Sequence, residues 1–378
     1  MQLNSNNLIC LVAGQSAGHI LPALTIAGQI KQAQPETQFL FFSNHTALDL
    51  KLLSHHPLIN QHVPLQLPQI PYRAPWRLPR FAWQLLKTLA QVYKLLKRTR
   101  PKQIISTGGL VSVPVGVLGW WLKIPVIVYE LNLHPGKAVQ FLARFAAQIK
   151  VCFAQTVHDL PKGKSELVDY PIRFTPQDYL LDHAQAFKLV QVELTIPKRH
   201  CEEQSDAAIY LHDLVSVGGS RPSQINQFNN NFKTILILGG SQGSRSLNEL
   251  VMGYVNQLPA GSQVQIIHQT GAQNCDLLNQ FYTLKQIPAL VFSYRENLMP
   301  YMICADLIIC RAGAGTLAEV LPLRKPVIVI PLQTSYTSHQ LENAQTLAQT
   351  HSQLTVLIQS EIEATPQTLY DTITTLLI

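Results

Sequence analysis

The sequence predicts an α/β protein built from two doubly wound domains with parallel sheets. The first observation behind this prediction is a pair of apolar runs, residues 8–13 and 235–238, which each pass through a glycine turn into a helical pattern. A strand, a glycine turn and a helix in this order open the nucleotide-binding unit of doubly wound domains. The second observation is that expected strands and helices alternate along nearly the whole chain, which favours parallel sheets.

The elements of the first domain are expected from apolar runs and helical periodicity. The helix after the first glycine turn is expected from Ile20, with Pro22 in its first turn, where proline is tolerated. Beyond it we expect strands at residues 38–42, 103–106, 125–129 and 149–153, and helices at residues 81–98, 111–122 and 136–147. The first domain is therefore expected at residues 1–173.

The second domain repeats the alternation and is expected at residues 233–378, with a shortened end. Its strands are expected near residues 235–238, 263–267, 289–292, 306–309, 326–330 and 353–357, with helices between them. Residues 174–232 are polar and lack a clear period, which indicates a linker that carries an inserted segment. A functional insert is the alternative interpretation.

Length and composition bound the possible functions. With 378 residues, 47% of them hydrophobic, the chain is long enough for two domains with full cores. The net charge of +7 at pH 7 favours an anionic partner. The six cysteines have neither zinc-site nor CxxC spacing, so we expect buried free thiols in a reducing compartment. We expect no signal peptide and no membrane span, and therefore a soluble or peripheral cytosolic protein.

A basic stretch stands out within the first domain. Between Asp49 and Glu130 the sequence has no acidic residue but eleven lysines and arginines, interleaved with aromatic and aliphatic residues, above all at residues 72–100. This combination is typical of a surface that docks on anionic lipid. An amphipathic core helix with a solvated basic face is the alternative. A nucleic-acid surface is a third interpretation, but no nucleic-acid motif accompanies the stretch, so we expect no nucleic-acid partner.

Several polar groups follow expected strands at the edge where doubly wound sheets bind ligands. His19 lies at the tip of the first glycine turn, and a histidine there could act as a base near neutral pH. Residues 107–109 and 129–132 also follow strands of this domain. In the second domain, the turn at residues 239–244 leads into a helix whose free backbone N–H groups could bind a phosphate.

Three more polar residues of the second domain are candidates for sugar binding. Glu319 follows a further glycine turn and could accept hydrogen bonds from a ribose diol, although a carboxylate early in a helix also stabilises the helix start. Gln340 and Asn343 are three positions apart and therefore share one helix face. Amides on one face suit sugar hydroxyls, although they could equally be ordinary surface residues.

Seven motifs occur in an order that resembles the MurG family of peptidoglycan N-acetylglucosaminyltransferases. They are GQSAGHILPAL (14–24), TGGLVSVP (107–114), YELN (129–132), YPIR (170–173), GGSQGSRSLN (239–248), CRAGAGTLAE (310–319) and HQLENA (339–344). The resemblance implies a GT-B fold, with two Rossmann-like domains facing each other across a cleft. It also implies transfer of N-acetylglucosamine from UDP-GlcNAc to the C4 hydroxyl of the muramyl sugar of lipid I. The products would be lipid II and UDP, with inversion at the anomeric carbon.

The resemblance also implies roles for individual residues. His19 is the expected general base and Glu130 is its rival, with Ser16 and Asn132 near the diphosphate-sugar of lipid I. Ser16, Gly18 and Asn132 are also expected among the residues that bind UDP-GlcNAc. In the second domain, the expected UDP-GlcNAc contacts are Ser241, Gln242 and Gly243 at the diphosphate, Tyr294 and Arg295 at uracil, Thr316 at a phosphate, Glu319 at the ribose, and Gln340 and Asn343 at the hexose. Arg173 is expected to reach the diphosphate from the linker edge. No cofactor or metal is expected, because no DxD or clustered His/Asp ligand set is present.

Departures from the family pattern leave alternatives open. Gln15, Ser16 and Ala17 replace most of a loop that is usually richer in glycine, and the chain ends earlier than the pattern. Leucines replace a tyrosine at 110 and a glutamine at 131. The leading interpretation is a lipid I glycosyltransferase acting peripherally at the cytoplasmic face of the cell membrane. The alternatives are another UDP-sugar transferase to a membrane lipid, a UDP-GlcNAc epimerase, or a protein that binds UDP-sugar without turnover.

Overall fold

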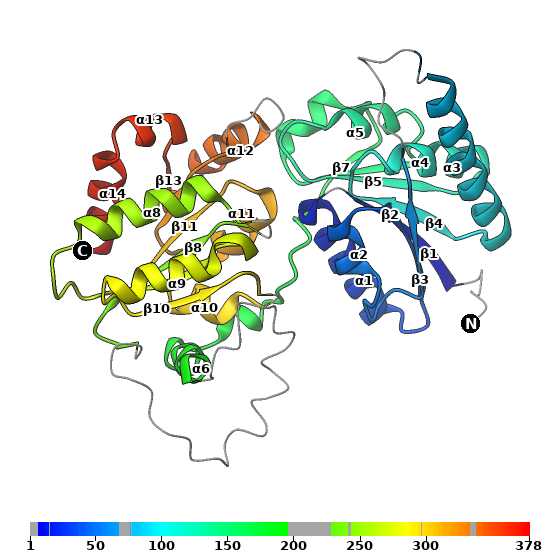
Figure 1. The fold of residues 1–378 in the computed structure, drawn as a ribbon. Helices are drawn as coiled ribbons and strands as arrows, with labels where there is room; N and C mark the ends of the chain where they lie inside the picture. The colour runs from blue at the N-terminus through cyan, green and yellow to red at the C-terminus, as the bar shows by residue number, and fades with distance from the viewer. Residues whose placement is uncertain are drawn as a thin grey trace. The chain divides into compact units, whose positions relative to one another are not determined.

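The structure is a computed structural model that describes residues 7–14, 16–67, 76, 78–195, 228–240, 243–295, 297–332 and 338–378. The chain forms two compact units, Met1–Arg173 and Phe174–Ile378 (Figure 1). Each unit is built on one sheet of parallel strands with helices on both faces. This arrangement confirms the two doubly wound α/β domains predicted from the sequence.

The first unit contains a seven-stranded sheet in the order β3-β2-β1-β4-β5-β6-β7. Its strands are β1 (Leu8–Val12), β2 (Gln38–Asn44), β3 (Gln61–Leu65), β4 (Gln103–Ser106), β5 (Val126–Glu130), β6 (Gln148–Val151) and β7 (Ser165–Leu167). All five residues of β1 are buried because helices cover both faces of the sheet. Strand order reverses between β1 and β4, whose carboxyl ends lie side by side, with Val12 opposite Ser106.

Two layers of helices cover this sheet. Helices α1 (Ala17–Ala33) and α2 (Ala47–Leu53) pack on one face through residues such as Ile20 and Leu53. On the other face, α3 (Leu78–Thr99), α4 (Ser112–Trp121) and α5 (Lys137–Leu142) pack through residues such as Val92, Val115 and Leu142. The helix predicted at residues 81–98 therefore does contribute to the core, with its apolar side only.

The second unit repeats the plan with a six-stranded parallel sheet in the order β10-β9-β8-β11-β12-β13. The strands are β8 (Lys233–Leu238), β9 (Val264–Gln269), β10 (Ala289–Phe292), β11 (Leu307–Cys310), β12 (Val327–Val329) and β13 (Leu354–Val356). Strand order reverses between β8 and β11. The two parts of the core lie on opposite faces of the sheet, as the alternating side chains Leu236 and Ile237 of β8 illustrate.

The helices of the second unit divide between the same two faces. One face carries α6 (His183–Thr195), α10 (Met299–Cys304), α11 (Ala314–Val320) and α12 (Ser338–Ala348). The other carries α8 (Arg245–Gln257), α9 (Cys275–Leu284), α13 (Gln359–Ala364) and α14 (Gln367–Leu377). Helix α6 falls in the range expected as a linker, but it buries Ala186, Phe187 and Val190 in this domain's core. Residues 196–227 of that range lie outside the described residues.

Cys10, Cys152, Cys304 and Cys310 are free, as predicted. Cys275 is disulfide-bonded, so the prediction of free thiols is wrong at that position. Cys201 lies outside the described residues. Among the helices of the described ranges, none is both long and apolar enough to cross a membrane.

Candidate functional site

The reversal of strand order in the first unit brings two predicted loops together. His19 lies in the first turn of α1, just after the loop that follows β1, and Thr107 directly follows β4. The Nδ1 atom of His19 lies 2.9 Å from the Thr107 carbonyl oxygen, and the Thr107 hydroxyl donates to the His19 carbonyl at 2.7 Å. Ligands bind at this topological position in doubly wound sheets, so the two loops form a candidate site.

Glycines make this close approach possible. At Gly108, φ is +113°, and a Cβ atom would lie 2.8 Å from Nδ1 of His19. At Gly109, φ is +88°, and a Cβ atom would lie 2.8 Å from the carbonyl oxygen of Gly14. A side chain at either position would be strained in its backbone and would also push the two loops apart. The Thr107-Gly108-Gly109 sequence therefore sets where the imidazole of His19 lies.

The contacts of His19 also determine its protonation state. A carbonyl oxygen can only accept a hydrogen bond, so the neutral imidazole carries its proton on Nδ1 and presents a lone pair at Nε2. Burial lowers the pKa of His19, and the bond to Thr107 opposes this only in part. His19 is therefore neutral at pH 7, with Nε2 able to accept a proton.

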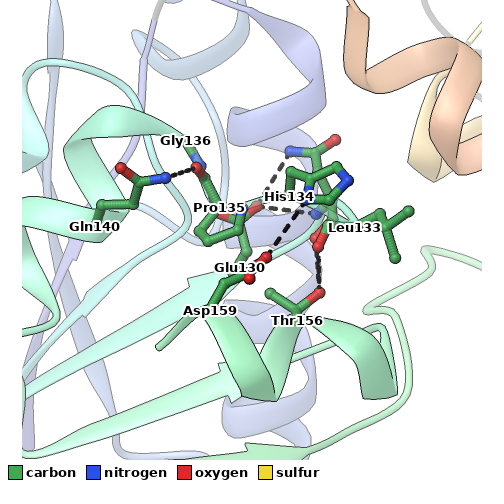
Figure 2. A network of polar contacts seen from close by, with 9 residues as sticks. Glu130, Leu133, His134, Pro135, Gly136, Gln140, Thr156 and Asp159 are labelled. Atoms are coloured by element: carbon green, nitrogen blue, oxygen red, sulfur yellow. Dashed lines mark hydrogen bonds and ion pairs between the residues drawn. The ribbon is translucent and has the colours of Figure 1, made fainter. Parts of the chain in front are cut away.

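Glu130 organises the loop that follows β5 (Figure 2). Its Oε1 atom accepts from the backbone N–H of Asn132 at 2.9 Å and from the Asn132 side chain at 3.2 Å, while its Oε2 atom accepts from the Gly136 N–H at 3.0 Å. Burial raises the pKa of Glu130, and these hydrogen bonds oppose the rise. Both carboxylate oxygens are thus engaged within the protein, which favours a positioning role.

Further contacts hold the same loop (Figure 2). The Thr156 hydroxyl donates to the Leu133 carbonyl at 2.6 Å, and the Gln140 side chain donates to the Pro135 carbonyl at 2.9 Å. Residues 132, 133, 135 and 136 of the loop are therefore each hydrogen-bonded to Glu130, Thr156 or Gln140. Asn132, a predicted acceptor-side residue, is held in place by this network rather than by the strand alone.

The second unit has an equivalent meeting of loops where β8 and β11 lie side by side. The loop after β8 leads into α8, and Ser244 is the N-cap residue of that helix, with its hydroxyl accepting from the Leu247 N–H at 3.4 Å. At Gly243, φ is +76°, and a Cβ atom would lie 2.2 Å from the Thr270 carbonyl oxygen. Only glycine fits there, as expected for a turn that exposes backbone N–H groups to an anion.

Arg311, directly after β11, connects the start of α8 to two other segments, the residue after β12 and helix α13. Its guanidinium donates to the hydroxyls of Ser244, at 2.9 and 2.5 Å, and of Ser246, at 2.6 Å. It also donates to the Ile330 carbonyl at 3.1 Å and to the Gln359 side chain at 2.9 Å. Only 7% of Arg311 is exposed, and burial lowers its pKa to about 10, against the opposing effect of Glu363.

The role of Arg311 was missed by the sequence analysis, although a signal for it exists. A charged residue directly after a fully buried strand lies at the ligand-binding edge of a parallel sheet. Because its pKa remains far above 7, Arg311 carries a positive charge behind the first turn of α8. That charge adds to the partial positive charge of the helix start.

The remaining predicted residues of the second unit lie at the same sheet edge or just beyond it. Tyr294 and Arg295 follow β10, and Thr316 lies in the first turn of α11. Glu319 lies in the second turn of α11, and its carbonyl accepts from the Tyr179 hydroxyl at 3.0 Å. In α12, Gln340 accepts from the Leu332 N–H at 3.0 Å, while Asn343 is 1% exposed.

The predicted residues therefore form two groups, one in each unit. The structure brings together His19 with Thr107, and Glu130 with Asn132, in the first unit. Ser16 is the N-cap residue of α1, and its hydroxyl oxygen would lie 3.7 Å from a Cβ atom added at Gly18. Arg173 is half-buried at the end of this unit. Ser241 and Gln242 lie outside the described residues. Within the described part of the chain, no group of three or more His, Cys, Asp or Glu could hold a metal ion.

Both halves of the chain match family models. Residues 9–151 match the glycosyltransferase family 28 N-terminal domain, and residues 234–377 match the glycosyltransferase family 28 C-terminal domain. The chain belongs to glycosyltransferase family 28. The two matches correspond to the two doubly wound units, and each includes the loops that meet at the reversal of strand order in its sheet.

Curated relatives of this family 28 chain share one name, UDP-N-acetylglucosamine--N-acetylmuramyl-(pentapeptide) pyrophosphoryl-undecaprenol N-acetylglucosamine transferase. The relative from Coxiella burnetii is 25% identical over 358 residues, which are 94% of this chain and 87% of the relative. The relative from Acetivibrio thermocellus is 27% identical over 373 residues, covering 98% and 89% of the two chains. The relative from Flavobacterium psychrophilum is 28% identical over 340 residues, covering 89% and 81%.

Solved structures share the fold of this family 28 chain. The crystal structure of Acinetobacter baumannii MurG has a TM-score of 0.66 at 23% identity, covering 98% of this chain and 91% of that one. The UDP-GlcNAc 2-epimerase from Neisseria meningitidis, bound to UDP-GlcNAc, has a TM-score of 0.56 at 13% identity, covering 98% and 91%. These likenesses confirm the predicted GT-B fold class, with two Rossmann-like domains.

Proposed function

We propose that this chain is an inverting glycosyltransferase that moves N-acetylglucosamine from UDP-GlcNAc to the C4 hydroxyl of the muramyl sugar of lipid I. The products are lipid II and UDP, and the process served is peptidoglycan synthesis. One observation carries the proposal: curated relatives named for this reaction align over 89–98% of the chain, through both domains. An epimerase shares the fold, but the three curated relatives described above, which align along nearly the whole sequence, are named as transferases.

The first domain supports activation of the acceptor. An alcohol is a poor nucleophile until its proton is removed, and a positioned base contributes about 10² to 10⁴ in rate. His19 suits this role because it is neutral at pH 7 and because its Nδ1–H bond to Thr107 fixes the ring with Nε2 as the basic atom. We assign Glu130 to positioning, since both of its oxygens hold the loop that carries Asn132.

The second domain supports binding of the donor. We propose that the diphosphate of UDP-GlcNAc binds at the start of α8, where Gly243 keeps the turn open and Arg311 supplies charge behind Ser244. Ser241, Gln242 and Arg173 complete this diphosphate site in the proposal. Positive charge of this kind takes the place that a bound metal has in other transferases, and the reaction is proposed to need no metal.

The rest of the donor is assigned to the neighbouring loops and helix starts. Tyr294 and the backbone of Arg295 face the uracil, Thr316 contacts a phosphate, and Glu319 holds the ribose diol. Gln340 and Asn343 hold the hexose, and the bond from the Leu332 N–H to Gln340 fixes that side chain beside the loop after β12. On the acceptor side, Ser16 and Asn132 are assigned to the diphosphate-sugar of lipid I, and Gly18 is assigned to the binding of UDP-GlcNAc.

A surface of the first domain supports docking on an anionic membrane. Helices α3, α4 and α5 lie on one face of the sheet, and large apolar side chains at their outer surface are exposed, among them Trp83, Leu86, Trp120, Trp121 and Phe141. Tyr93 of α3 contacts Trp121 of α4, and Trp120 of α4 contacts Phe145 in the turn after α5.

Basic residues accompany this apolar surface. The Lys87 ammonium lies 5.3 Å from the ring of Trp83, and that of Lys97 lies 5.5 Å from the ring of Tyr93. Aromatic side chains beside lysines suit the boundary between anionic headgroups and acyl chains. We therefore propose peripheral binding to the cytoplasmic face of the cell membrane. Tyr72, Arg73 and Arg77, which the predicted stretch includes, lie outside the described residues.

The experiment that tests the proposed function is a transfer assay with purified protein, UDP-GlcNAc and a lipid I analogue, run in the presence of a chelator. We expect UDP release that requires the acceptor and a product heavier by one N-acetylhexosamine. UDP release without the acceptor, or conversion of the donor to its epimer, would contradict the proposal. Binding of UDP-GlcNAc without any turnover would favour the alternative of a binding protein, and activity only after Mg²⁺ addition would overturn the metal-free part.

A further inference from the structure

A partly buried cluster of polar side chains lies beside the loop between β10 and α10, and the roles proposed above use none of these side chains. It consists of Glu193 from α6, Arg295 from the loop and Tyr301 from α10. The Arg295 guanidinium donates to Glu193 Oε1 through Nε at 3.0 Å and through Nη2 at 2.5 Å. The Tyr301 hydroxyl donates to the other carboxylate oxygen of Glu193. One carboxylate therefore joins three segments of the second domain.

This cluster is shielded from water and packed against an aromatic ring. The side chains of Arg295 and Glu193 are 17% and 11% exposed, and Tyr301 is 6% exposed. The Arg295 guanidinium lies 5.1 Å from the ring centre of Phe292, which itself contacts the ring of Tyr301. Because removing one partner of a buried pair leaves the other charge uncompensated, the contact resists opening.

The cluster also fixes the backbone that precedes it. The Nη1 atom of Arg295 donates to the Tyr294 carbonyl at 3.4 Å, so the guanidinium holds its own loop as well as α6. Phe292, at the end of β10, accepts at its carbonyl from the Thr270 N–H at 3.0 Å. The loop is thus tied to the sheet at its start and to α6 at Arg295. Its position depends on a helix that precedes β8 in sequence and that contributes no predicted site residue.

We propose that Glu193 is a positioning residue that sets the nucleobase preference of the donor site. The inference rests on the proposed function, in which Tyr294 and the backbone of Arg295 face the base. Backbone N–H and C=O groups distinguish one nucleobase from another only if the loop that carries them is rigid. A loop that shifts can form equivalent hydrogen bonds with a different nucleobase. The Glu193–Arg295 pair supplies this rigidity from behind the loop.

The test compares Glu193→Gln with the unchanged protein by titration calorimetry, using UDP and CDP as probes. The two nucleotides differ only at the hydrogen-bonding edge of the base. The ratio of the UDP affinity to the CDP affinity therefore measures recognition of the base, because the diphosphate contributes equally to both affinities. We expect Glu193→Gln to weaken UDP binding by about tenfold and CDP binding by much less, so that the ratio falls. At saturating UDP-GlcNAc, kcat should stay within about twofold, because the acceptor and the base are untouched.

Two controls separate positioning from loss of stability. Glu361→Gln removes an exposed carboxylate of the same domain, and Ile373→Val weakens its core; both should leave the UDP/CDP ratio unchanged. If Glu193→Gln does not fold, Tyr301→Phe is the second variant, because it removes only the hydroxyl that donates to Glu193. It should also lower the ratio of UDP affinity to CDP affinity. An unchanged ratio in the folded variants, with normal UDP binding by the parent, would overturn this inference alone. A parent protein that binds neither nucleotide would overturn the proposed donor site as well.

Discussion

Replacement of His19 by alanine isolates the contribution of the proposed general base. Among the described residues, the side chain bonds to the Thr107 carbonyl, from Nδ1 at 2.9 Å, and it is half-buried. Losing that bond should cost about 1 kcal/mol of folding stability. Losing a positioned base should instead reduce kcat by about 10² to 10⁴, which corresponds to about 3 to 5 kcal/mol of activation free energy. The kinetic effect is therefore several times larger than the structural effect can explain.

The assay measures kcat with a lipid I analogue and, separately, the affinity for UDP. We expect UDP affinity to change by less than about twofold, since the donor is proposed to bind the other domain. His62→Ala is a matched control, because His62 is also half-buried, bonds to Ser43 at 2.8 Å and has its pKa lowered by burial. This control should keep normal turnover. Near-normal kcat in His19→Ala would refute the assignment of the base.

The pH dependence gives a second readout of the same group. Because burial lowers the pKa of His19, the neutral form that can accept a proton persists below pH 6.5. The rate should therefore be flat near neutral pH and fall as pH drops through a value below 6.5. A profile that falls already between pH 8 and 7 would contradict the predicted direction of the shift.

Glu130→Gln should raise the KM for the acceptor without changing UDP affinity, because the new amide NH₂ group would face the backbone N–H of Asn132 or of Gly136. An unchanged KM would contradict the assignment of Glu130 to positioning. Gly243→Ala should abolish UDP binding measured by calorimetry, since the new Cβ would lie 2.2 Å from the Thr270 carbonyl. Binding to anionic vesicles should fall steeply with salt and with Trp83→Ala, whereas equal binding to neutral vesicles would exclude the electrostatic part. Burial lowers the pKa of His268 to about 3, so below pH 6.5 the unfolded chain binds a proton at this residue that the folded domain does not. In urea unfolding, this group should therefore make the domain roughly 2 kcal/mol less stable at pH 5 than at pH 7. His268→Gln should remove this part of the pH dependence.

Most of the two sheets was predictable from the sequence because their strands are buried on both faces. Strands such as Leu8–Val12 and Leu307–Cys310 appear as unbroken apolar runs that end in glycine turns. The elements that were missed lack this signal. Strand β3 contains Gln61, His62 and Pro64, which its position at the sheet edge tolerates. Helix α6 has its apolar residues in a polar stretch, and only the tertiary structure shows that they reach the core.

The candidate site was predictable in its loops but not in its contacts. The glycine turns indicated which residues lie at the ligand-binding edge, and His19 was found in this way. Its tautomer depends on the Thr107 carbonyl, which is distant in sequence and becomes a neighbour only through the reversal of strand order. The same reversal in the second domain gives Arg311 its bonds to Ser244. The Glu193–Arg295 pair spans 102 positions and carries no local motif.

The linkage in the product tests the central claim most directly. Purified protein is incubated with UDP-GlcNAc and a lipid I analogue, and the new glycosidic bond is determined by NMR. Base-assisted attack by the C4 hydroxyl from the face opposite UDP predicts a single β-1,4 linkage between N-acetylglucosamine and the muramyl sugar. An α linkage, attachment at another hydroxyl, or a product that forms without the muramyl acceptor would contradict the account.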